Sequence, residues 1–206
     1  MMELRIEQKA EELFFTYGLK SVTMDDIARE AGVSKKTIYQ IFDDKNAVVT
    51  NVISKLISEQ EKQLKQSSKT AENAVHEIKL ISEGLASLVM KLRPVLIYDL
   101  HKYFPDCWGM MKRFKEENLR SAIIANLEKG IAEGLYRKDL DFETICQFGL
   151  VQFSSFFAPE SYPSNKFKLI KVIIEITELV LYGIGSPKGL PLIKKHFENK
   201  HNEYQL

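Results

Sequence analysis

The sequence predicts an all-α fold in which a small amino-terminal three-helix domain precedes a larger helical bundle. Apolar residues recur at three- and four-residue spacing along most of the chain, which is typical of amphipathic helices. Breakers and caps such as Gly18, Pro94, Pro105 and Asp141 divide these segments into separate helices. The period-two alternation of strands is absent. With 206 residues, 45% of them hydrophobic, the chain is long enough to bury a core.

Composition excludes several classes of protein. The chain has 29 basic and 28 acidic residues, a formal charge of +1, so any contact with nucleic acid must be local. Cys107 and Cys146 are the only cysteines and form no Cys-x-x-Cys pair, which argues against structural zinc and a disulfide framework. Neither a signal peptide nor a long apolar segment is present. We therefore expect a cytoplasmic protein with no membrane partner, no metal and no cofactor.

Two short helices are predicted in the first 31 residues. Apolar spacing places a helix between Ile6 and Tyr17, which Gly18 is expected to end. The next helix starts at Thr23, three residues before Asp26, in a pattern that resembles a capping box.

A tight turn at Gly32 leads to a third helix, predicted at Ser34–Phe42. Glycine takes positive φ without steric cost, and the Ser34 hydroxyl can cap the helix that follows. Two short helices joined in this way, with another before them, predict a helix-turn-helix, whose second helix enters the DNA major groove. The side chains expected to contact phosphates or base edges from this helix are Lys35, Lys36, Thr37, Tyr39 and Gln40.

A fourth, longer helix is predicted to start with Asp43 as its cap. It carries the apolar seam Val48, Val52 and Leu56 before the sequence turns polar at residues 60–69. We place the domain junction within this helix. The predicted division is residues 1–46 for DNA binding and residues 47–206 for ligand binding and dimerisation.

The carboxy-terminal part contains a predicted helical hairpin, Phe142–Phe157 and Phe167–Tyr182, joined by a loop at Ala158–Asn165. Its second helix is more apolar than a peripheral helix requires, which indicates an interface. The predicted dimer interface residues are Phe153, Phe157, Ile170, Ile173, Ile174, Thr177 and Leu181. Aromatic and methionine side chains predict a ligand pocket, with Tyr98, Trp108, Met111, Phe114 and Phe148 as its residues. These side chains are also compatible with an ordinary core.

The run from Val22 to Val48 resembles the DNA-binding signature of tetR-family (tetracycline-repressor-like) regulators. The likeness covers about the first quarter of the chain and includes Gly32, the Tyr39-x-x-Phe42 pair and Lys45. It implies that Thr23 touches phosphate, that residues 35–40 line the groove, and that Tyr39 and Lys45 hold the DNA backbone. It also implies a homodimer formed by the last two long helices, which binds a near-palindromic double-stranded operator.

The resemblance further implies a repressor that a small apolar or amphipathic ligand releases from DNA. Residues 1–50 carry seven basic and nine acidic side chains, a net charge of −2. Since counterion release supplies much of the affinity for DNA, each subunit is expected to bind modestly, and two must act together.

Two other classes of function remain open from the residues. A small all-α enzyme or cofactor-binding bundle predicts paired carboxylates or Glu-x-x-His motifs that point inward from facing helices, and we find no such arrangement among the predicted helices. We therefore expect no catalytic residues. A helical protein-interaction adaptor predicts the same surface at Ser34–Phe42 but no binding to DNA.

Overall fold

The computed structural model describes residues 2–157 and 169–198 and confirms the all-α prediction. Within these ranges no strand occurs, and one isolated antiparallel bridge joins Tyr136 to Gly185. The predicted loop Ala158–Asn165, the predicted helix start at Phe167 and the chain beyond residue 198 lie outside the described residues.

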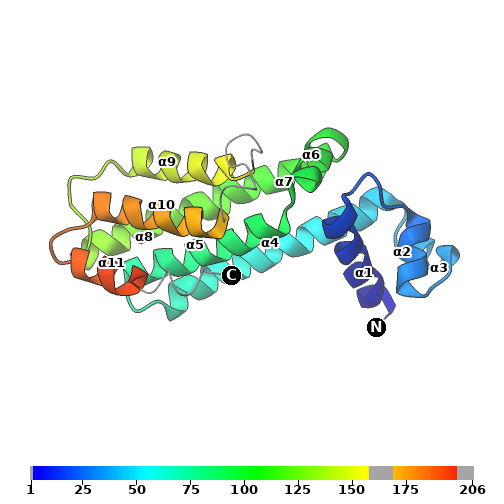
Figure 1. Ribbon diagram of the computed structural model, residues 1–206, viewed down its shortest axis with the longest axis horizontal. Coiled ribbons are helices and arrows are strands. Elements are labelled where there is room, and N and C mark those ends of the chain that lie inside the picture. The colour runs from blue at the N-terminus through cyan, green and yellow to red at the C-terminus, as the bar shows by residue number, and fades with distance from the viewer. Residues whose placement is uncertain (1, 158–168, 199–206) are drawn as a thin grey trace. The chain divides into compact units, whose positions relative to one another are not determined.

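The amino-terminal helices are α1 (Met2–Tyr17), α2 (Met24–Ala31), α3 (Lys35–Tyr39) and α4 (Lys45–Thr70) (Figure 1). Helix α2 packs against both α1 and α3. Each contributes fully buried side chains to a shared core, among them Phe14, Ile27 and Ile38. The apolar spacing of the sequence therefore produces a three-helix domain around one small core.

Two boundaries differ from the sequence prediction. The third helix ends at Tyr39, and Gln40 to Phe42 form a turn that leads to α4. Asp43 is not the cap of α4, because the Oδ1 of Asp44 accepts the backbone N–H of Ala47. An N-cap side chain reaches the amide three residues on, and with α4 starting at Lys45 that position belongs to Asp44.

The remaining helices are α5 (Ala74–Lys91), α6 (Pro94–Tyr103), α7 (Pro105–Arg113), the π-helical segment η1 (Phe114–Leu119), α8 (Arg120–Ala132), α9 (Phe142–Ser155), α10 (Leu169–Ile184) and α11 (Leu190–Phe197). As predicted, Asp141 caps α9, and its Oδ1 accepts the N–H of Thr144 at 2.6 Å.

The chain packs into two compact units. The first contains Met1–Glu59 and Lys91–Arg113, and the second contains Gln60–Met90 and Phe114–Leu206. Helices α6 and α7 thus belong to the same unit as the three-helix domain, and α4 contributes to both units. The division at residues 46 and 47 concerns function and stays a prediction.

A buried polar chain links three elements of the second unit. The hydroxyl of Tyr136 donates to Asn126 Oδ1 at 3.0 Å, and Asn126 Nδ2 donates to the carbonyl oxygen of Ala74 at 2.9 Å. Burial raises the pKa of Tyr136, so the phenol keeps its proton and donates. These bonds hold helix α8 against the start of α5.

Helices α5 and α11 meet at a pair of stacked imidazoles. The rings of His76 and His196 lie 4.8 Å apart between centroids and are nearly parallel. The Nε2 of His196 is buried without a hydrogen-bond partner in the described structure. Burial and the neighbouring His76 lower the pKa of His196.

None of the described helices combines the length and apolar character needed to cross a membrane.

Candidate nucleic-acid interface and internal cavity

Local hydrogen bonds set the geometry at the start of α2. Thr23 Oγ1 accepts the N–H of Asp26 at 3.1 Å, and Asp26 Oδ2 accepts the N–H of Thr23 at 2.9 Å. The hydrogen bonds from Thr23 lower the pKa of Asp26 to about 2, with a further contribution from Arg29. The Thr23 side chain is therefore held at the exposed start of the helix, where the resemblance expects a phosphate contact.

Gly32 makes the turn between α2 and α3. Its φ is +61°, in the left-handed region that suits glycine, and the next amide, of Val33, donates to Ala28 O at 3.0 Å. Ser34 Oγ then accepts the N–H of Thr37 at 3.0 Å and begins α3. The corner predicted from sequence is present, and short-range bonds fix the direction in which α3 leaves it.

The short helix α3 has one buried side and one exposed side. Ile38 is fully buried, whereas the side chain of Tyr39 is 46% exposed. Lys36 and Gln40 are also exposed, and Thr37 is half-buried. The exposed side thus presents an ammonium, an amide and a phenol, which are suitable groups for phosphate oxygens and base edges.

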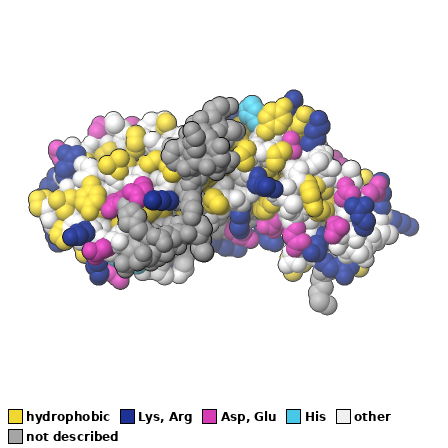
Figure 2. Space-filling view, viewed as in Figure 1, with side chains coloured by type: hydrophobic (Ala, Val, Ile, Leu, Met, Phe, Trp, Pro, Cys, Tyr) yellow, Lys and Arg dark blue, Asp and Glu magenta, His cyan; other side chains and the backbone are white. Residues whose placement is uncertain are grey.

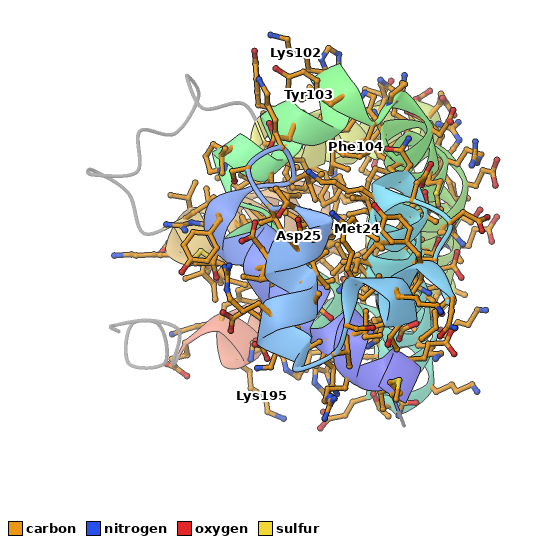
Figure 3. All side chains as sticks on the ribbon, turned by 90° about the vertical axis from the view of Figure 1, so that its right-hand side faces the viewer. Met24, Asp25, Lys102, Tyr103, Phe104 and Lys195 are labelled. Carbon is orange, nitrogen blue, oxygen red and sulfur yellow. The ribbon has the colours of Figure 1, made fainter. Side chains whose placement is uncertain are left out.

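Lys35 and Lys36 have different surroundings. The Nζ of Lys35 lies 2.9 Å from Oδ1 of Asp25, which is labelled in Figure 3. This ion pair joins α3 to α2 and raises the pKa of Lys35. For Lys36 the described part of the chain shows no ion pair. Because an exposed ion pair is weak, a phosphate can displace Asp25 from Lys35. The Lys35–Asp25 pair was not predicted from the sequence, in which Lys35 and Lys36 had the same expected role.

Lys45 and Asp99 hold the turn between α1 and α2 from two sides. Lys45 Nζ donates to the carbonyl oxygen of Lys20 at 3.2 Å, and the N–H of Lys20 donates to Asp99 Oδ2 at 2.8 Å. Partial burial lowers the pKa of Lys45. Gly18 has a φ of +86°, and a Cβ there would lie 3.0 Å from Asp99 Oδ2. The turn therefore needs glycine both for its backbone and for the close carboxylate.

Helix α6 makes two more contacts with the same part of the chain. Lys20 Nζ donates to the hydroxyl of Tyr103 at 3.1 Å, and this bond lowers the pKa of Tyr103 (Figure 3). Arg93 Nη1 donates to Thr16 O at 2.9 Å. Sequence analysis did not find this support, because Asp99 and Lys20 are 79 residues apart.

The second unit contains an apolar cavity of about 140 Å³. Its walls come from α5, η1, α8, α9 and α10, and none of the described side chains that line it is charged. The polar side chains of the walls are Asn126, Gln152 and Thr177. Phe148, a predicted pocket residue, lines the cavity and is also 47% exposed, so it lies at the mouth.

The other predicted pocket residues do not line this cavity. Tyr98 lies on α6, and Trp108 and Met111 lie on α7, all in the first unit. Phe114 is buried at the start of η1. Their role in ligand binding stays a prediction. The pocket prediction rested on aromatic and methionine side chains and did not include the aliphatic residues that form most of the walls, such as Ile81 of α5.

The predicted interface residues lie mostly inside the protomer. The buried residues of this set are Phe153, Ile173, Ile174 and Leu181, and the half-buried ones are Phe157, Ile170 and Thr177. The members of the set that line the cavity are Phe153, Ile173, Thr177 and Leu181. Their role in a dimer stays a prediction. Val151 is 55% exposed and Leu179 is 72% exposed, both on the hairpin helices α9 and α10. Figure 2 shows hydrophobic side chains over these two helices.

A short exposed helix, fixed to a second helix by a glycine corner, is the reading element of a helix-turn-helix DNA-binding regulator. Residues 6–52 match the family model described as "Bacterial regulatory proteins, tetR family". The amino-terminal domain is therefore similar to the DNA-binding domain of the tetR family of regulators.

Known proteins resemble the chain over most of its length. An uncharacterized HTH-type transcriptional regulator, YvaF of Bacillus subtilis (strain 168), is 24% identical over 166 residues, which cover 80% of this chain and 86% of YvaF. A transcriptional regulator from Cytophaga hutchinsonii ATCC 33406 has a TM-score of 0.75 at 18% identity, covering 89% of this chain and 98% of that one. The regulator FadR of Bacillus subtilis, in complex with stearoyl-CoA, has a TM-score of 0.69 at 19% identity, covering 88% and 99%. The structural likenesses extend the common fold beyond the family domain to the larger helical part.

Proposed function

We propose that the protein is a transcriptional repressor that binds a palindromic operator as a homodimer and leaves it when a small molecule occupies the cavity. The observation that carries this proposal is the exposed side of α3, with Lys36, Tyr39 and Gln40 directed to solvent beside the fixed Gly32 corner. Lys36 and Gln40 can bond to base edges, while Tyr39 and Lys45 can hold the DNA backbone. Catalysis has no part in this mechanism.

Dimerisation follows from the charge of the DNA-binding segment. Residues 1–50 carry a net charge of −2, and Asp25 already pairs with Lys35. One subunit can therefore release few counterions from DNA, and two linked subunits gain affinity through effective concentration. A two-fold dimer places its recognition helices about 34–36 Å apart, which corresponds to a palindrome with half-sites one turn apart.

The exposed apolar residues of α9 and α10 support this hairpin as the dimer surface. Leu179 and Tyr182 are three residues apart on α10, and Phe148 and Val151 are three apart on α9, so each pair shares one side of its helix. A second copy would bury them. The neighbouring predicted residues Phe157 and Ile170 are half-buried and can extend the same surface.

Release by a ligand is supported by the uncharged cavity under the same two helices. A ligand shifts the equilibrium only by its difference in affinity for the DNA-bound and free arrangements. Since α9 and α10 form both a cavity wall and the proposed dimer surface, occupancy can change how two copies meet, and with it the separation of their recognition helices. FadR, solved with stearoyl-CoA, gives an example of a ligand bound to this fold.

Selection of bound sequences from a random DNA pool, at moderate salt and with a parallel sizing measurement, tests the proposal. The expected result is a dimer that enriches a palindrome with half-sites about one turn apart. A folded protein that enriches no sequence would contradict it and favour the adaptor function.

A further inference from the structure

We infer that the cavity takes an uncharged, mainly apolar molecule about as large as a single six-membered ring, bearing one alcohol or carbonyl oxygen. This inference rests on the proposed function, because it names the class of ligand that would act there. Three features of the cavity carry it, namely its volume, its lack of charge and its few polar atoms.

The volume limits the part of a ligand that the cavity can enclose, and Phe148 marks its opening to the surface. At about 140 Å³, the cavity is close to the roughly 150 Å³ of an apolar protein cavity known to bind benzene. Aliphatic side chains such as Ile81, Ile123 and Ile173 form its inner walls. Such walls match a compact hydrocarbon skeleton and give buried water few partners.

The surroundings provide nothing to neutralise a charged ligand. The cations on α8 are Arg120, which pairs with Glu143, and Lys129, whose Nζ lies 2.8 Å from the buried carboxylate of Glu77. On α5, Lys79 pairs with Glu83 at 3.2 Å, and Lys91 at the end of the helix is exposed and does not line the cavity.

The remaining helices of the walls have no suitable cation either. Lys171, the cation of α10, is exposed and does not line the cavity, and α9 has none. Lys115 of η1 lies 2.9 Å from Glu116. A carboxylate or a phosphate group inside the cavity would therefore lack a cation, and an ammonium group would lack a carboxylate, because none of the described lining residues is Asp or Glu; either burial has a large cost.

Two wall residues have polar atoms available to a ligand oxygen. Thr177 Oγ1 donates its proton to Ile173 O at 2.8 Å, which leaves the hydroxyl oxygen free to accept. The amide nitrogen of Gln152 has no hydrogen-bond partner in the part of the chain that the structure describes, so it is available to donate. Asn126 is already bonded through both polar atoms, to Tyr136 and Ala74. An alcohol complements both available groups, and a carbonyl oxygen complements Gln152.

Four probes with the same ring separate these features. Toluene, benzyl alcohol, benzoate and benzylammonium differ in the polar group alone, and their binding to the full chain is measured by calorimetry at pH 7 without DNA. We expect both neutral probes to bind, and the two ions to bind at least about 100-fold more weakly than benzyl alcohol.

Variants locate the site. Val180→Phe fills the cavity and is expected to abolish binding of both neutral probes, whereas Val95→Phe makes the same change at an exposed position of α6 in the first unit and leaves binding unchanged. Thr177→Val, which is close to isosteric, should weaken benzyl alcohol about 5-fold and leave toluene unaffected. This second variant keeps the test valid if Val180→Phe does not fold.

Three results would overturn the inference: benzoate or benzylammonium binding as tightly as benzyl alcohol, neither neutral probe binding at millimolar concentration, or binding that persists in folded Val180→Phe. Because DNA is absent from this experiment, its outcome is independent of whether the DNA selection succeeds.

Discussion

The DNA-binding region and the second unit use similar amphipathic helices for opposite purposes. Around α3, the apolar side points inward to Ile38, and the polar side chains Lys36 and Gln40 point outward. Helices α9 and α10 instead direct apolar side chains toward the cavity, and none of the described residues that line it is charged.

Each surface has the chemistry of its expected partner. DNA is a polyanion. In the first region, Lys35 pairs with Asp25 and Lys45 donates to the carbonyl oxygen of Lys20. Both contacts are solvent-exposed, so phosphate groups can replace them. None of the described residues that line the cavity is charged, so we expect its specificity to depend on shape and a few polar atoms.

The largest effect is expected from Leu179→Glu, which places a charge on the proposed dimer surface. Leu179 is 72% exposed, so the protomer should fold normally while dimerisation is lost. Without two linked subunits, affinity for a selected palindrome should fall by about 1,000-fold. Analytical ultracentrifugation and a mobility shift measure the two effects. Leu190→Glu on α11 is the matched control, and a Leu179→Glu protein that remains a dimer would exclude this surface.

A double variant, Tyr39→Ala with Lys45→Ala, tests the DNA backbone contacts. Losing two hydrogen bonds to phosphate should weaken binding about 100-fold, nearly uniformly across DNA sequences. Titration at fixed salt by mobility shift gives the affinity, with Lys62→Ala as a control on the distal part of α4. Undiminished binding by the folded double variant would contradict the assignment of the site.

Asp99→Ala tests whether α6 positions the DNA-binding turn. Loss of the carboxylate leaves the N–H of Lys20 without its acceptor and frees the turn that also holds Lys45. We expect about 10-fold weaker binding to DNA at unchanged helix content, measured by fluorescence anisotropy and circular dichroism. Asp99→Asn retains an acceptor oxygen and should bind within about 3-fold of the original protein. Equal losses in both variants would show that the hydrogen bond is not what positions the turn.

The smallest effect is on the pH dependence of stability and involves neither recognition surface. The pKa of His196 is lowered by burial and by His76, so below about pH 6.5 the unfolded chain binds more protons at this residue than the folded one does. The free energy of unfolding should therefore fall as the pH drops from 7.5 to 5.5. His196→Phe preserves the stacked ring and should reduce this dependence in urea unfolding. Identical pH profiles would mean that His196 has no part in it.

Features determined by neighbouring residues could be predicted from the sequence. Helix caps and the glycine corner depend on residues within a few positions. The structure shows the predicted caps at Thr23, Ser34 and Asp141 and the predicted corner at Gly32. The cap at Asp43 was wrong by one residue, because two adjacent aspartates have the same local pattern and only the helix start distinguishes them.

Features determined by distant residues could not be predicted. The apolar periodicity of α10 identified Ile173 and Leu181 but not what they contact, and in the structure both line the cavity. The support from Asp99 depends on packing between α6 and a turn far away in sequence. A helical pattern shows that a residue belongs to an apolar side, whereas its partner is decided by the tertiary fold.

The most direct test of the central claim, that the exposed side of α3 reads DNA sequence, compares two selections from one random DNA pool. The original protein should enrich a palindrome. Lys36→Ala should enrich a palindrome altered at one symmetric pair of positions, because Lys36 is expected to contact a base edge in each half-site. Enrichment of the same sequence by both proteins would contradict this role for Lys36, and enrichment of none by the folded original protein would contradict the account as a whole.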